Sequence, residues 1–219
     1  MTPALLPSPV PIDRRLLLPA RPAALRVAVV VAAAFLVGGL TSLGQAFLPA
    51  EFASLANSAS GWTLPTAALV WLTAPGHVEA ALGAALGFAA MTVGYSVVSG
   101  WRGFPFDPTE WALVGIVVGP VVGTAALALR RGPVASALGT GILAGICVGE
   151  GVYGLTAVAD TTSPVYWWAV VVVGAALVGI AAARLRSVPP IALAVLVTAI
   201  VAGAFVAAYL ALPLLFLAF

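Results

Sequence analysis

The sequence has few of the residues that most often carry protein chemistry. It contains no lysine, one cysteine (Cys147) and one histidine (His77), and only 7% of its 219 residues are charged, against about 25% in soluble domains. A single cysteine excludes an internal disulfide, and one histidine supplies too few ligands for a metal site. No basic cluster with interleaved aromatic residues is found, which argues against nucleic-acid binding. We therefore expect no metal, no cofactor and no nucleic-acid partner.

Apolar residues, in contrast, make up 63% of the chain and form repeated runs of about 20 residues. Runs of this length predict an all-α fold, a polytopic integral membrane bundle whose main partner is the lipid bilayer. Seven transmembrane helices are expected, at 23–43, 61–75, 77–99, 109–129, 133–158, 165–185 and 190–212. The second is short enough to be either a partial span or a re-entrant segment.

The arginines decide between these two readings of the second helix, because basic residues accumulate on the cytoplasmic side. With seven spans and the N-terminus inside, eight of the nine arginines are cytoplasmic and only Arg102 is outside. A re-entrant second segment would reduce this asymmetry to five against four. The sequence thus predicts seven spans, with the N-terminus inside and the C-terminus outside, in the plasma membrane of a bacterium.

Two parts of the chain are expected. Residues 1–22 are rich in proline and predict a flexible cytoplasmic tail. Residues 23–219 predict a single transmembrane domain with a polar outer loop at 44–60.

The predicted fifth helix is unusually rich in glycine, and small residues spaced by four allow helices to approach closely in lipid. Gly141, Gly145 and Gly149 form one stripe, while Gly139 and Gly154 lie on roughly the opposite side. Neighbours on both sides place this helix at the centre of the bundle. We expect leucine at Gly145 to be more damaging than leucine at Gly174 of the sixth helix, which carries bulky valines on most faces.

Glu150 lies well inside the fifth helix, where an unpaired carboxylate costs several kcal/mol. It therefore either faces a polar cavity and handles a ligand, or is hydrogen-bonded to a neighbouring helix with no further role. Its possible partners are Arg102, Tyr153 and the only two amides of the chain, Gln45 and Asn57. These five residues are the candidate ligand-binding set; catalytic residues are not identified.

The polar stretch "LTSLGQAFLPAEFASLANSASGW" (40–62) surrounds both amides. Irregular backbone at membrane depth is tolerated only against protein or water, which favours the wall of a cavity. The alternative is an amphipathic loop that rests on the outer surface.

The stretches "LTSLGQAFLP", "LANSASGW" and "GLTAVADTTSPVYW" resemble an uncharacterised family of small multi-pass membrane proteins from high-GC bacteria. The resemblance implies no activity and no catalytic residues.

Three functions follow from these features. The first is a small-molecule carrier or substrate-binding membrane subunit with an outward-facing polar pocket, and the second is a membrane enzyme acting on a lipid or isoprenoid with Glu150 as acid–base group. The third is a structural or partner-binding membrane protein without a ligand. An enzyme requires a second titratable group near Glu150, a carrier requires a pocket with a path, and a structural protein requires only that Glu150 be capped.

Overall fold

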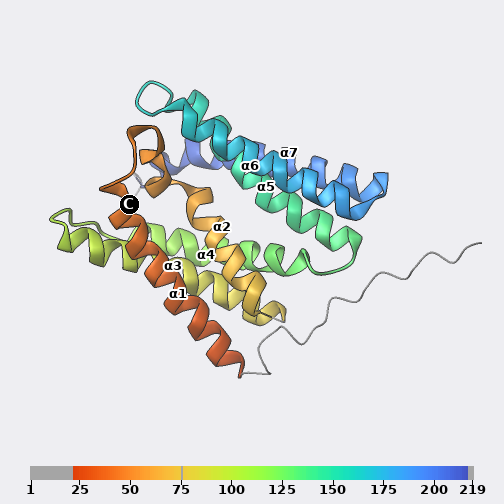
Figure 1. Cartoon of the computed structure of the whole chain (residues 1–219), viewed down its shortest axis with the longest axis horizontal. Helices are drawn as coiled ribbons and strands as arrows, with labels where there is room; N and C mark the ends of the chain where they lie inside the picture. The colour runs from red at the N-terminus through yellow and green to blue at the C-terminus, as the bar shows by residue number, and fades with distance from the viewer. Residues whose placement is uncertain (1–21, 75, 217–219) are drawn as a thin grey trace, which may run out of the picture.

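The computed structural model describes residues 22–74 and 76–216, and this part of the chain is entirely helical (Figure 1). The predicted tail, residues 1–22, lies outside the described residues except for Pro22. The elements are α1 (Ala23–Gln45), the 3-10 helix η2 (Ala50–Asn57), α2 (Ala59–Thr73), α3 (His77–Trp101), α4 (Thr109–Ala128), α5 (Pro133–Thr156), α6 (Pro164–Leu185) and α7 (Val188–Phe216). All seven predicted helices are present, and hydropathy and Pro/Gly punctuation placed their ends within a few residues.

Six of the described helices, α1 and α3 to α7, are long and apolar enough to cross a membrane. They make the chain a multi-pass membrane protein. The exception is α2, whose 15 residues extend over about 22 Å at about 1.5 Å per residue.

Helices α1 and α3 run parallel, side by side. At their first turns, Nη2 of Arg26 lies 2.7 Å from Oε1 of Glu79. Near their other ends, the Tyr95 hydroxyl donates to Oε1 of Gln45 over 2.6 Å. Because the two helices point the same way, the intervening η2 and α2 must carry the chain back from the end of α1 to the start of α3.

Glycines bring the helices of the N-terminal half, α1 to α4, into backbone contact. A Cβ atom at Gly38 would collide with the Met91 carbonyl of α3, and one at Gly94 would collide with the Phe35 carbonyl of α1. Gly123 of α4 lies equally close to the Ala80 carbonyl of α3. Interlocking of this kind fixes α1, α3 and α4 as one packed unit.

The C-terminal half, α5 to α7, is built in the same way around α5. The stripe of Gly141, Gly145 and Gly149 faces α7, while Gly151 and Gly154 face Trp167 of α6. The most apolar window of α5 is 67% buried, the highest value among the six long helices. This confirms the prediction that the fifth helix is central.

Gly174 corrects the expectation about α6. A Cβ atom there would lie 2.8 Å from Cγ2 of Val148 and 3.0 Å from the Ala144 carbonyl oxygen. Several valines of α6 are exposed, among them Val165, Val172 and Val173, whereas Gly174 is one of the points at which α6 approaches α5. Gly174 is therefore a packing glycine like Gly145, and it is not the tolerant position that the surrounding valines indicated.

Charge separates the two ends of the bundle. The end at which α1, α3, α5 and α7 begin, here called the basic end, carries Arg26, Arg130, Arg131, Arg184 and Arg186, with Glu79 as its one described acid. The opposite end, here called the acidic end, carries Glu51, Asp107, Glu110 and Asp160, with Arg102 as its one described arginine. Exposed aromatic residues also lie at the acidic end, among them Phe47, Trp101, Phe104 and Trp168.

Candidate functional site

Glu150 lies six residues before the end of α5 and is 3% exposed. Its carboxylate points at the N-terminus of α2, the short helix that lies between the two halves. A buried carboxylate needs hydrogen-bond donors on both oxygens, and this helix start supplies them.

Backbone and hydroxyl groups of residues 58–60 donate to the carboxylate. The amide of Ala59 donates to Oε1 over 2.5 Å. The amide of Ser60 and the hydroxyl of Ser58 each donate to Oε2 over 2.9 Å, and the Ser60 hydroxyl contacts the same oxygen. Both oxygens of the carboxylate therefore accept hydrogen bonds from one short segment.

The same contacts account for the start of α2, where the amides of the N-cap Ser58 and of the next three residues have no partner within the helix. Glu150 accepts from the amides of Ala59 and Ser60. The amide of Gly61 donates to the Ser58 hydroxyl over 2.9 Å, and that of Ser58 donates to the Leu55 carbonyl over 3.3 Å. A negative charge also complements the helix dipole at this end. Glu150 and Ser58 together cap a helix start that is buried in the bundle.

This arrangement holds the carboxylate of Glu150 against the start of α2. All hydrogen bonds to its carboxylate in the described part of the chain come from residues 58–60. The buried Tyr166 of α6 lies near the same serines. In the described part of the chain the geometry of Glu150 is that of a helix cap.

None of the four predicted partners of Glu150 donates a hydrogen bond to its carboxylate in the described residues; those bonds come from residues 58–60. Gln45 accepts from Tyr95, and the guanidinium of Arg102 donates to the Ser42 carbonyl. Tyr153 packs against Tyr209 of α7 with ring centroids 5.3 Å apart. Asn57 is exposed, although it directly precedes the serine that caps α2.

No hydrogen bond thus joins Glu150 to any of the other four predicted residues in the described part of the chain. The 44–60 stretch does contact Glu150, but through the backbone amides and serine hydroxyls of residues 58–60 rather than through Gln45 or Asn57. Because every residue except proline carries a backbone N–H, no unusual residue type marks such a partner in the sequence. Ser58, a residue type preferred at helix N-caps, is the signal that could have indicated it.

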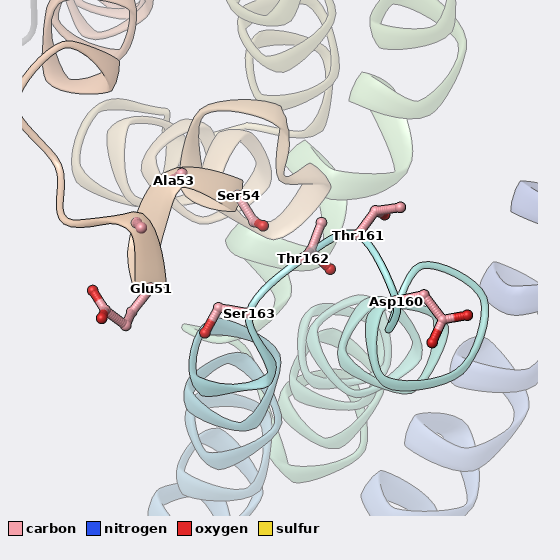
Figure 2. Close-up of a pocket in the computed structure, with 8 residues that line it drawn as sticks. Glu51, Ala53, Ser54, Asp160, Thr161, Thr162 and Ser163 are labelled. Carbon is pink, nitrogen blue, oxygen red and sulfur yellow. The ribbon is translucent and has the colours of Figure 1, made fainter.

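A polar pocket does open on the acidic end, and the 44–60 stretch forms one of its walls. Its volume is about 420 Å³, and its other wall is the connection between α5 and α6 (Figure 2). It is lined by Ala50, Glu51, Ala53, Ser54, Asp160, Thr161, Thr162 and Ser163. In Figure 2, Glu51 and Asp160 lie on opposite sides of the pocket, with their carboxylates pointing away from each other. Ser54 and Thr162 lie between them.

Two indole groups, of the half-buried Trp62 and the buried Trp167, hydrogen-bond the two walls of this pocket. Nε1 of Trp62 donates to the Ala56 carbonyl over 3.0 Å and fixes the end of η2. Nε1 of Trp167 donates to Oγ1 of Thr162 over 2.8 Å and fixes the α5–α6 connection. The pairing of this connection with η2 depends on how the two halves dock.

The described residues thus define a multi-pass helical membrane protein with a capped internal carboxylate and a polar pocket at one end. A family model described as a family of unknown function (DUF6518) matches residues 18–214. The chain belongs to this family, in agreement with the resemblance seen in its sequence. No curated protein and no solved structure matches it.

Proposed function

We propose that this protein binds a small polar solute in the pocket between η2 and the α5–α6 connection, as a carrier or a substrate-binding subunit of the membrane. The observation that carries the proposal is the position of the pocket. It lies on the line where the N-terminal and C-terminal halves meet, with one wall from each half. Ligand sites in helical membrane proteins commonly occupy such junctions.

The lining indicates which solutes fit. Six of the eight lining residues are polar, two of these are acidic, and none is basic. Such a surface repels anions and favours a solute that is cationic or that donates hydrogen bonds. A volume of about 420 Å³ is within the range of about 300–1,000 Å³ typical of small-molecule pockets.

The capped state of Glu150 supports a second candidate, a structural or partner-binding protein without a ligand. In that case the cap would be the entire role of the carboxylate, and the pocket would be a surface depression. The enzyme hypothesis receives less support, because acid–base catalysis needs a group that is free to exchange a proton with a substrate.

We also propose that the chain crosses a bacterial plasma membrane seven times, with the basic end in the cytoplasm. The parallel arrangement of α1 and α3 supports the odd number of crossings, since η2 and α2 return the chain between them. The arginines of the basic end support the orientation, and the exposed aromatic residues of the acidic end suit the outer interface.

The proposal is tested by thermal unfolding of the purified protein in detergent with a panel of probes. Putrescine, choline, glycerol and acetate at 10 mM represent diamines, quaternary amines, polyols and anions. A solute present at about 100 times its Kd stabilises the native state by about 2.7 kcal/mol. We expect the unfolding temperature to rise with an amine or the polyol and not with acetate.

Ser54→Trp fills the pocket and is expected to abolish the shift. Ser187→Trp, at an exposed position beyond α6 at the opposite end, is the matched control and should retain it. If no probe raises the unfolding temperature, or if Ser54→Trp responds like the wild type, the pocket is not a binding site.

A further inference from the structure

The two halves are joined in different ways at their two ends. Near the basic end, Gly139 of α5 lies against the Ala125 carbonyl and the Ala128 side chain of α4. Figure 1 shows α4 and α5 converging there and diverging toward the other end, with α2 between the halves. At the acidic end the junction is filled by η2 and the start of α2.

The contact at the acidic end is made by hydrogen bonds rather than by interlocked backbones. Within each half, glycines allow one helix to enter the surface of the next, and separating such helices would require repacking. Across the acidic end of the junction, the carboxylate of Glu150 bonds residues 58–60. Water can replace these hydrogen bonds, and the apolar contacts beside them are made by the side chains of Trp62 and Leu64. This contact can therefore open without repacking the interlocked helices within either half.

The hydrogen-bond pattern of α2 is interrupted shortly after its first turn. Pro65 lies inside α2 and has no amide hydrogen, so the helical bond to the Gly61 carbonyl is missing. On the other side, Ser58 is extended, with φ −92° and ψ 127°. The first turn of α2 is therefore flanked by two points at which the backbone can bend.

We propose that residues 50–64, here called the strap, close the junction between the two halves at the acidic end, and that Glu150 is the catch that holds the strap shut. When the catch releases, the strap swings about Pro65 and the junction opens toward the pocket. The hinge on the opposite side is the Gly139 contact between α4 and α5. Glu150 thus acts through the strap and does not touch the solute.

The single thiol of the chain reports this motion. Cys147 is fully buried one turn before Glu150, in a cluster with Tyr166, Trp167 and Val170. Leu64 of the strap packs against this cluster. Opening the strap moves Leu64 away from this cluster and exposes Cys147 to water and reagents. No additional cysteine has to be introduced to detect the motion.

The test measures the rate at which a charged, membrane-impermeant maleimide modifies Cys147 in the full-length protein in detergent, well below the unfolding temperature. Glu150→Gln replaces one acceptor oxygen by a donor facing other donors, and is expected to raise the rate about tenfold. The double variant Ser58→Ala/Ser60→Ala removes hydroxyl donors from the same catch and is expected to raise it as well. It also provides the test if Glu150→Gln does not fold.

The control is Glu79→Gln, which breaks the pair with Arg26 at the basic end. It destabilises the bundle without touching the strap, and its labelling rate should equal that of the wild type. Equal rates in the wild type and both catch variants would overturn the proposal, as would an equal increase in Glu79→Gln, which would indicate general loosening. The measurement uses no solute, so its outcome is independent of whether the pocket binds one.

Discussion

The amide nitrogen of Ser60 lies 2.9 Å from Oε2 of Glu150, although 90 residues separate the two in the sequence. The bond joins the start of a short helix in the N-terminal half to the central helix of the C-terminal half. The bond offsets the free-energy cost of burying a carboxylate in the bundle. The donors that Glu150 needs are backbone amides at the start of α2 that have no acceptor within that helix. The carboxylate supplies acceptors to the start of α2, and the start of α2 supplies donors to the carboxylate.

Replacing Glu150 tests this reciprocal cap. Glu150→Leu leaves the amides of Ala59 and Ser60 buried without acceptors, and each such group costs about 1–3 kcal/mol. We expect the free energy of unfolding to fall by about 2–5 kcal/mol in total, measured by denaturing-detergent titration. Glu150→Gln keeps one acceptor oxygen and should lose less. Equal stability of the two variants would show that the carboxylate is not the cap.

Glycine packing on α5 predicts a contrast between two positions. A Cβ atom at Gly145 would lie 2.6 Å from Cβ of Val201, whereas nothing lies within 4 Å of one at Gly203. Gly145→Leu should therefore force α5 and α7 apart and sharply reduce the yield of folded protein, while Gly203→Leu should be tolerated. Gel filtration and thermal unfolding of both variants check this, and similar behaviour would contradict the close packing of α5 on α7.

The contacts of Arg102 predict that its replacement lowers the free energy of unfolding more than replacement of Arg131 at the opposite end of the bundle. Its guanidinium donates to the carbonyl of Ser42 and joins the end of α3 to α1. Arg102→Gln should lower the free energy of unfolding by about 1–3 kcal/mol, because a charged hydrogen bond to a buried carbonyl is lost. Arg131 is exposed, so Arg131→Gln should change it by less than about 0.5 kcal/mol. Equal losses would mean that Arg102 is a surface charge only.

The proposed topology predicts the activity of reporters fused along the chain. Alkaline phosphatase, which is active only outside the cytoplasm, should be active after Gly103 and after Phe219 and inactive after Arg131. A chain in which α2 failed to cross would give the reverse pattern at Gly103 and Arg131. The fusions thus separate seven crossings from six.

Much of the fold follows from the sequence, for a local reason. Hydropathy, helix length and Pro/Gly punctuation are properties of consecutive residues, so the seven helices are found where the sequence predicts them. The glycine stripe of α5 follows from helical periodicity alone, and its neighbours on both sides were expected. The location of most arginines at one end and most acids at the other also follows from the sequence, because successive long helices alternate in direction.

What only the tertiary structure decided is which groups meet. The sequence indicated that Glu150 needs a partner, but the candidates it offered were conspicuous side chains, Arg102, Tyr153, Gln45 and Asn57. The actual partners are mostly backbone amides, and their availability depends on where a helix begins and how it docks. For the same reason the tolerance of Gly174 was misjudged from its neighbours in sequence, and the pocket wall at 160–163 was not foreseen. Contacts across 90 residues depend on how the two halves pack, and no local pattern encodes them.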